Sequence, residues 1–599
     1  MESKNLPDYL PTPKNTFPSF HLRTGEGNNV NKNRRANASG YPVPGVQSPT
    51  AASVMTEDYF VSDETWENIL DHGAFDYVVV GSGCTALAFI DKTLGLDPTK
   101  RILVLERGDF WLPSHFQNMP LPFKMVLGGP SETFPWSLSR KTFHTSELVY
   151  CHGSCPFLGG RSTFWSAWCP EPTTDLMRGF PDSMTKKVNE TFWKSAEGLL
   201  HVTPAEKIGD GIFTGLQNAI DKNLHDNLSR IPTANFSESG RLAVGPGSAS
   251  STLRFNKWSV PGPLLGLVEK QRKLADSGLT EGAPLELTTA CTVNKMIPDD
   301  DGTVRVIETS RGVISWIDDQ TKIILCGGTI PNATLLLNSF DKAKNTVGKR
   351  LTGHFLTHIV ARCPIKHVPG YAPTNNLQIG ASYLAGQDPN TKRQYHSQIT
   401  SIHSPDPEQE AEDAARECPD YAAAATYEQL KDSKNHVVFV CATLGEFDEN
   451  NKDNFVRLNN TQDPSCNVTL QFTLSDDDKK LWDTMDKATY ESIPAMTNGT
   501  NIEYWDESKK EWGPNKPPVS TIRINGVVHE ASTAFVGDES AGGSLDEWYR
   551  PHGIKNVFVT GGAIFPTAGS WNPTLTMCGF AQDLAQQLND GHPADAFGK

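Results

Sequence analysis

A strand, a glycine turn and a helix follow one another in FDYVVVGSGCTALAF, residues 75–89. The apolar run before the turn is continuous rather than alternating, which is typical of a strand covered on both faces in a parallel sheet. Gly81, Gly83 and Ala86 fit the pattern G-x-G-x-x-[GA]. The first glycine permits a tight turn, the second lets the backbone approach a pyrophosphate, and the small third residue lets the helix pack on the strand. Free N–H groups at the helix start would then bind phosphates.

A second apolar strand, in DPTKRILVLERG, ends at Glu106, 20 residues after Ala86. A carboxylate at this position would accept hydrogen bonds from ribose hydroxyls, and a merely tight strand–helix turn would not explain it. The strand before the turn, the helix after it and the acid in register therefore predict a dinucleotide site.

A chain of 599 residues is too long for one compact core, so we expect at least two domains. Residues 1–60 are rich in Pro, Asn, Gly and Ser, which predicts a flexible extension. A helix capped by Ser62 or Asp63 follows. We expect residues 61–355 and 521–599 to form the dinucleotide-binding domain, with pieces of a substrate domain around 180–245 and its main part at 356–520.

Further strands and glycine-marked turns support this division. GAPLELTTACTVNKMIPD, VRVIETSRG, TKIILCGGTIPNATLLLNS and KNVFVTGGAIFP indicate strands of the nucleotide-binding fold. Between about 360 and 520, polar, acidic and loop-rich sequence such as DPEQEAEDAARECPD alternates with short strands such as HVVFVCAT and CNVTLQFTL. We expect an inserted α+β domain built on an antiparallel sheet.

Composition excludes several partners. The chain carries 54 basic and 70 acidic residues, a net charge of −16, without the clusters of Lys and Arg that nucleic acid or anionic membranes require. Its 11 cysteines have no regular spacing, which fits a reduced compartment better than a disulfide framework. The N-terminus has no apolar signal-peptide core and no run of eighteen apolar residues occurs, so we expect a cytoplasmic protein without a membrane span.

Four separated segments resemble the glucose–methanol–choline (GMC) family of FAD oxidoreductases. They are YVVVGSGCTALAF with ILVLERGDF, CPFLGGRSTFWSAWCPEP, IILCGGTIPNATLLLNS with VGKRLTGHF, and GGAIFPTAGSWNPTLTMCGFAQDLA. GGRSTFW and PTAGSWNPTLT look closest to the pyranose oxidase branch. The resemblance implies an α/β fold of the GMC/PHBH type, with a Rossmann-like FAD-binding domain. It also implies FAD contacts at Gly81, Gly83, Ala86, Glu106, Gly159, Gly160, Ser162, Thr163, Val293, Gly327, Pro573 and Thr574.

The same resemblance shows one departure at the flavin. Pyranose oxidases commonly read S-T-H-W where this chain reads Ser162-Thr163-Phe164-Trp165, and the family's histidine carries a covalent flavin link. Phenylalanine has no nucleophile, so FAD is expected to be held non-covalently. Losing the link is expected to lower the flavin potential.

The family resemblance also implies a catalytic pair. A neutral histidine suits the removal of a proton from an alcohol, because its unperturbed pKa of about 6.5 lies near working pH. HEASTAFVG resembles the family's H-x-x-x-T…G frame with His529 first, and Asn572 in WNPTLT stands where the family has the second residue. Ala531, Ser532 and Phe535 depart from the frame, which weakens any expectation that the substrate is a sugar.

His529 has two other interpretations, a zinc ligand and a core histidine. The zincin pattern H-E-x-x-H fails because position 533 is threonine, and a core histidine is the plain alternative. No G-x-S-x-G elbow indicates a serine hydrolase. Glu530 is expected to be solvated or bonded to backbone, or else to raise the basicity of the pocket.

Several neighbouring residues are ambiguous. Cys151, His152 and Cys155 form C-H-x-x-C, which is in the wrong order for haem attachment and lacks a second cluster for zinc, so no metal is expected. Trp165, Trp168 and Trp571 could wall the flavin or the substrate, or fill core. Cys84 is expected to have no redox role, and His354 and His358 are expected to be structural.

The sequence therefore predicts an FAD-dependent oxidoreductase acting on an alcohol or a carbohydrate-like secondary alcohol. His529 would be the base, Asn572 would orient the hydroxyl, and oxygen or a quinone-type acceptor would take the electrons. Three rivals remain: a lyase on the same fold with structural FAD, a non-catalytic FAD-binding relic, and a binding protein without flavin.

Overall fold

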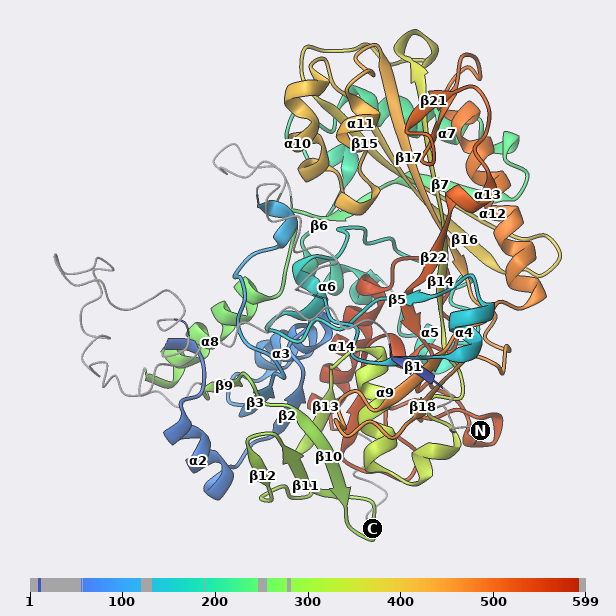
Figure 1. The fold of residues 1–599 in the computed structure, drawn as a ribbon. Coiled ribbons are helices and arrows are strands. Elements are labelled where there is room, and N and C mark those ends of the chain that lie inside the picture. The colour runs from blue at the N-terminus through green and yellow to red at the C-terminus, as the bar shows by residue number, and fades with distance from the viewer. Residues whose placement is uncertain are drawn as a thin grey trace, which may run out of the picture.

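Two sheets dominate the computed structural model (Figure 1), which describes residues 9–11, 55, 58–119, 132–188, 190–245, 256–276 and 282–591. Within the predicted N-terminal extension, Tyr9–Pro11 form a short strand, β1, that pairs antiparallel with β4 (Ser137–Ser139). Most of the rest of residues 1–60 lies outside the described residues. From Ser62 onward the chain enters the body of the fold.

The first sheet is parallel and has five strands. Its order is β23 (Val557–Val559), β13 (Lys322–Leu325), β2 (Tyr77–Val80), β3 (Ile102–Leu105) and β9 (Leu285–Thr288). Every residue of β3 and β23 is buried, as the continuous apolar runs predict. The Rossmann-like part of the predicted fold is thus confirmed.

Helices cover this sheet and connect its strands. α3 (Cys84–Leu96) joins β2 to β3, α8 (Pro261–Asp276) precedes β9, and α9 (Thr329–Ser339) follows β13. The last helix, α14 (Thr574–Asn589), packs against α3. α2 (Asp63–His72) begins as predicted, with the Ser62 side chain accepting a hydrogen bond from the Thr65 N–H.

The second large sheet has nine strands and is antiparallel apart from the pairing of β22 with β5. Its main path is β21 (Glu511–Gly513), β20 (Glu503–Asp506), β14 (Thr352–Pro364), β17 (His436–Glu446), β16 (Gln394–His403), β15 (Gln378–Gln387) and β7 (Ala234–Ser239). Off this path, β22 (Arg523–Ala531) pairs with β14 and with the two-residue strand β5 (Tyr150–Cys151). α7 (Gly215–Asp226) and α12 (Asp476–Met496) pack on this sheet. In Figure 1 the sheet fills the upper right, and β14 and β22 reach from it toward the parallel sheet.

The smaller elements form three further sheets and several short helices. Three further sheets contain β10 (Val293–Pro298), β11 (Val304–Thr309) and β12 (Gly312–Ile314); β1, β4, β19 (Val468–Gln471) and β18 (Phe455–Leu458); and β6 (Val202–Pro204) with β8 (Arg241–Ala243). The remaining helices are α4 (Arg140–Thr145), α5 (Asp182–Thr185), α6 (Glu190–Leu200), α10 (Pro407–Glu417), α11 (Tyr427–Leu430) and α13 (Val519–Ile522).

Two local expectations were wrong. CNVTLQFTL forms β19, but this strand pairs with β4 and β18 in the four-stranded sheet instead of joining the large one. DPEQEAEDAARECPD was expected to be loop-rich and instead contains α10. Pro407 at the helix start, acidic residues in the first turn and Arg416 in the last turn stabilise that helix.

All eleven cysteines are free, in keeping with the expected absence of a disulfide framework. Among the described residues, none of the helices combines the length and the apolar character needed to cross a bilayer.

The glycine turn predicts unequal costs for two similar substitutions. Gly81 has a φ of +97°, and a Cβ there would lie 2.7 Å from the Cys326 carbonyl oxygen, so Gly81→Ala should destabilise the fold by about 2–3 kcal/mol. Gly83 has a φ of −79° and no heavy atom within 4 Å of a Cβ, so Gly83→Ala should cost no more than about 1 kcal/mol. Urea unfolding of the two variants measures the difference, and equal losses would contradict it.

Candidate functional site

The end of β22 crosses the carboxyl edge of the parallel sheet. The Thr329 hydroxyl, at the start of α9, donates to the Glu530 carbonyl at 2.7 Å, and the Thr533 hydroxyl donates to the Thr329 carbonyl at 2.9 Å. The Ser532 N–H donates to the Gly562 carbonyl, just beyond β23, at 3.0 Å. Ligands of open α/β sheets bind outside the carboxyl ends of their strands, so this edge is the candidate site.

The two predicted glycine segments meet at this edge. The Ser82 N–H and hydroxyl donate to Glu106 Oε2 at 3.1 Å and 2.5 Å, and the Gly159 N–H donates to the Ser82 hydroxyl at 3.0 Å. A Cβ on Gly160 would lie 3.9 Å from the Gly83 Cα. The turn after β2 and the segment around Gly159 therefore face one another across a short gap.

Glu106 lies at the end of β3 and is buried. Its second oxygen accepts the Gly108 N–H at 2.9 Å. Burial raises the pKa of the Glu106 carboxyl to about 7, against the lowering effect of the hydrogen bonds from Gly108 and Ser82. The protonation of this group therefore changes near neutral pH.

Ser162 and Thr163 close the turn at Gly159 and Gly160. The Ser162 hydroxyl donates to the Gly159 carbonyl at 2.6 Å and accepts the Val260 N–H at 3.0 Å. The Thr163 hydroxyl donates to the Gly160 carbonyl at 2.9 Å. Both hydroxyls are thus used in shaping the segment.

The other predicted cofactor residues surround the same edge. The Cys291 N–H donates to the Glu106 carbonyl at 2.8 Å, two residues before Val293 begins β10. Gly327 lies two residues beyond β13, and its N–H donates to Asn332 Oδ1 at 3.0 Å. Ala86 is fully buried in α3, and Pro573 and Thr574 begin α14. Among the described residues, no side chain caps α3 or α14, so N–H groups at both helix starts can donate to a ligand.

His529 has a strained backbone in β22. Its φ is +55°, and the pairing between β14 and β22 shifts register on both sides of His354. A non-glycine residue at positive φ costs of order 1–3 kcal/mol and is held only where its surroundings over-determine it. The irregularity re-aims the imidazole of His529, which is half-buried.

The ring of His529 contacts the ring of His354, which is fully buried in β14. The two Nδ1 atoms are 2.9 Å apart, and the rings meet edge to face with centroids 5.0 Å apart. Burial and the nearby His354, His152 and Arg161 hold the pKa of His529 well below its usual range. Burial also lowers the pKa of His354 to about 4 and that of His152 to about 3. His529 is therefore a neutral imidazole at neutral pH.

Glu530 is buried in an ion pair, so the expectation of a solvated or backbone-bonded carboxylate was wrong. Its Oε1 lies 2.7 Å from Arg161 Nη1, and its side chain is 4% exposed. Arg161 also donates to the carbonyls of His152 and Gly153. Burial opposes the Arg161 charge, but Glu530 and Glu132 outweigh burial and raise the pKa of the guanidinium. The ion pair joins the Gly159–Thr163 segment to β22.

Asn572 is buried at the other side of the site. Its Oδ1 accepts hydrogen bonds from the Tyr383 hydroxyl at 2.9 Å and from Gln398 Nε2 at 2.7 Å. Tyr383 packs edge to face on Trp168, with centroids 4.7 Å apart. Two donors on the amide oxygen leave the amide N–H groups as the donors that Asn572 can present to a ligand.

The loop that carries Asn572 also contacts His354, the ring partner of His529. His354 Nε2 lies 3.4 Å from the Ala568 carbonyl, and His396 Nδ1 lies 2.5 Å from the Ser570 hydroxyl, two residues before Asn572. Sequence reasoning missed five participants: Arg161, His354, Tyr383, His396 and Gln398. Arg161 and His354 lie inside the recognised GGRSTFW and VGKRLTGH segments, whereas the other three carry no motif signal.

The ambiguous aromatic residues take different positions. Trp571 is fully buried, and its Nε1 donates to Thr576 at 3.1 Å, which is a core role. Trp165 is half-buried and donates to the Trp258 carbonyl. Phe164 packs near Phe116, with centroids 6.5 Å apart.

The Cys151–His152–Cys155 segment lies beside β22, with the His152 N–H donating to the Val527 carbonyl. Burial raises the pKa of both thiols well above its usual range. In the part of the chain that the structure describes, no three His, Cys, Asp or Glu side chains group as metal ligands would.

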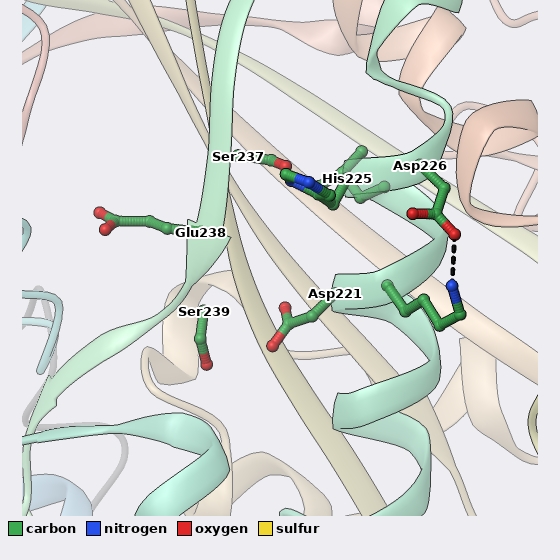
Figure 2. A pocket seen from close by; sticks show the side chains of 8 residues that line it. Asp221, His225, Asp226, Ser237, Glu238 and Ser239 are labelled. Carbon is green, nitrogen blue, oxygen red and sulfur yellow. Dashed lines mark hydrogen bonds and ion pairs between the residues drawn. The ribbon is translucent and has the colours of Figure 1, made fainter.

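A cavity of about 310 Å³ lies elsewhere, between α7 and β7 (Figure 2). Asp221, His225 and Asp226 come from α7, and Ser237, Glu238 and Ser239 come from β7. Asp221 accepts hydrogen bonds from Ser382 and Gln217. None of the predicted catalytic or cofactor residues lines this cavity, so it is not the candidate site.

Residues 450–581 match the family model described as GMC oxidoreductase, and this stretch includes both His529 and Asn572. The structure is similar to pyridoxine 4-oxidase from Mesorbium loti, with a TM-score of 0.52 and 13% sequence identity over 87% of this chain and 100% of that chain. No curated protein matches the chain. The likeness confirms the predicted fold, and the family match agrees with the GMC resemblance in the C-terminal part. The pyranose oxidase branch stays a prediction.

The cavity beside α7 predicts a pH effect on stability. Burial raises the pKa of Glu238 to about 7, with Glu171, Asp221 and Glu206 adding to the shift. The folded chain therefore keeps a proton that the unfolded chain releases above about 4.5, so this group costs stability as pH rises from about 4.5 to 7. Glu238→Gln should be more stable than the parent by about 1–2 kcal/mol at pH 8 and equal to it at pH 4.5.

Urea unfolding at both pH values checks this expectation. Glu269→Gln, which changes an exposed glutamate of α8, is the matched control and should show no such difference. A gain for Glu238→Gln of the same size at both pH values would contradict the assignment to its ionisation.

Proposed function

We propose that this chain is an FAD-dependent oxidoreductase that oxidises an alcohol, or a carbohydrate-like secondary alcohol, to a carbonyl. One observation carries the proposal: β22 brings a neutral imidazole, His529, to the carboxyl edge of the parallel sheet, where the Arg161–Glu530 ion pair ties it to the Gly159 segment. A base and a dinucleotide turn at one edge suit the removal of a proton and a hydride from a single substrate.

The residues at the edge fit FAD. A Cβ on Gly83 would meet nothing within 4 Å, so the turn has open space for a pyrophosphate beside the uncapped start of α3. Glu106 would hold the ribose, while Gly159, Gly160, Val293, Gly327, Pro573 and Thr574 would line the remainder. Phe164 offers no nucleophile, which supports non-covalent binding. Bound FAD would supply the hydride acceptor, flavin N5.

His529 would take the hydroxyl proton as the substrate is oxidised. Its low pKa supports this role, because the imidazole is unprotonated at neutral pH and can accept a proton. Asn572 would orient the same hydroxyl by donating from its amide nitrogen, since Tyr383 and Gln398 already occupy the amide oxygen. A His/Asn pair with GGRSTFW supports a place near the pyranose oxidase branch.

The net charge of −16 favours a substrate that is not strongly anionic. The structural neighbour is an oxidase, which favours oxygen over a quinone-type compound as electron acceptor. The pocket wall would be shaped by Ala531, Ser532 and Phe535, and the nine-stranded sheet would supply the rest of the substrate contacts.

The base assignment predicts the outcome of an anaerobic flavin-reduction screen over sugars, aryl alcohols and other secondary alcohols. At least one substrate class should bleach the flavin. His529→Ala should slow bleaching by about 10²–10⁴-fold while FAD stays bound, because general-base catalysis contributes that much. His225→Ala, beside the remote cavity, is the control and should leave the rate unchanged.

A purified protein that remains colourless after FAD is added would refute the flavoenzyme assignment. Bound FAD that no alcohol bleaches would favour the lyase alternative instead. A His529→Ala variant that reduces FAD at the parental rate would refute the role of the base.

Glu106 predicts that FAD affinity depends on pH. A ribose hydroxyl donates to an ionised carboxylate, so binding favours the charged form and releases the proton that Glu106 holds near its pKa of about 7. FAD should bind up to about tenfold more tightly at pH 8 than at pH 6. Glu106→Gln should bind more weakly and lose this dependence. Fluorescence titration of the apoprotein measures both, and an unchanged pH dependence in Glu106→Gln would contradict the assignment.

A further inference from the structure

We propose that His354 is a positioning residue that fixes the tautomer of His529, so that Nδ1 of His529 carries the proton and Nε2 keeps a free lone pair. The proposal rests on the proposed function of His529 as the base. It goes beyond that function by naming the nitrogen that accepts the proton and the residue that selects it.

The rings of His354 and His529 are in contact through their Nδ1 atoms. His354 Nδ1 and His529 Nδ1 are 2.9 Å apart, a distance at which one nitrogen must carry a proton and the other a lone pair. The contact alone leaves two arrangements: His529 donates to His354, or His354 donates to His529.

The contact on the far side of the His354 ring selects between these two arrangements. Its Nε2 lies 3.4 Å from the Ala568 carbonyl oxygen, and a carbonyl can only accept. The proton of a neutral His354 therefore lies on Nε2, and its Nδ1 is left as an acceptor. The opposite arrangement would aim an imidazole lone pair at a carbonyl lone pair in a buried place.

This assignment of protons requires both imidazole rings to be neutral. His354 is fully buried between β17 and β22, where an uncompensated charge is costly. Burial lowers the pKa of both histidines, and the groups that face them add positive or neutral neighbours: His152, His396 and Arg161, whose charge Glu530 balances. With one proton on each ring, the hydrogen bonds run from His529 Nδ1 to His354 and from His354 Nε2 to Ala568.

This arrangement leaves His529 Nε2 as the acceptor for the substrate proton. After the proton is taken, His529 still donates from Nδ1, so its new charge is met by the His354 acceptor. Ala568 lies four residues before Asn572, so the same loop that fixes the base also carries the second predicted catalytic residue.

The direct test is the protonation of His529 in the protein as purified with its FAD. ¹⁵N NMR of histidine-labelled protein should show a protonated Nδ1 and an unprotonated Nε2, with the His529 signals assigned by their loss in His529→Ala. His354→Asn can place its Oδ1 where Nδ1 stood and should keep this tautomer. His354→Leu removes the acceptor and should shift His529 toward the other tautomer.

Kinetics give a second readout. His354→Leu should slow anaerobic flavin reduction at least tenfold while retaining FAD, and His354→Asn should recover most of the rate. His358→Leu, the same change four residues along β14, should leave both the tautomer and the rate as in the parent.

A protonated Nε2 on His529 in the parent, or an unchanged tautomer in His354→Leu, would overturn the proposal. Failure of the proposed function has a different signature, because His529→Ala would then reduce FAD at the parental rate whatever tautomer the spectra show.

Discussion

The ion pair between the partly exposed Arg161 and the buried Glu530 is the interaction on which the arrangement of the site depends. It joins the Gly159–Thr163 segment, which faces the glycine turn, to β22, which belongs to the nine-stranded sheet. Arg161 also binds the His152 and Gly153 carbonyls, so one guanidinium holds three segments together. Removing Arg161 leaves the buried Glu530 carboxylate without its charge partner, and the solvent exposure of Arg161 keeps the cost below the roughly 3–5 kcal/mol of a fully buried pair. The Gly159–Thr163 segment and β22 are therefore held together beside His529.

The fold could be predicted where short-range pattern decides structure. The apolar runs of β2, β3, β13 and β23 and the glycine turn at Gly81 were sufficient for the parallel sheet, because burial on both faces leaves a continuous signature. The partners of β19 could not be predicted, since an isolated strand has no local feature that selects its neighbour. The acidic, polar composition of α10 is equally typical of a loop, so only the proline at its start indicates a helix there.

The residues of the candidate site also divide into those that local sequence indicates and those that it does not. Gly81, Gly159, His529 and Asn572 lie in stretches whose residue order resembles the GMC family, so they could be named from the sequence. Tyr383, His396 and Gln398 converge on the Asn572 loop only through the register of β15 against β16, in which Tyr383 stands opposite Gln398. The contact between His354 and His529 could not be predicted, because the sequence around His354 says nothing of the bulge that turns His529 toward it. Contacts that depend on sheet register and on a strained φ leave no mark on local sequence.

The electrostatics of the site set opposite demands on one residue. In the proposed role of base, His529 must be neutral to accept a proton, and burial together with His354, His152 and Arg161 keeps it so. Those same features disfavour the charged imidazole that would form after proton transfer. The pairing of Arg161 with Glu530 limits this penalty, because the Glu530 carboxylate offsets the positive charge that Arg161 brings to the site. For the proposed base, the ion pair thus weakens one of the contributions that oppose the charged imidazole, while burial and His354 still keep the resting ring neutral.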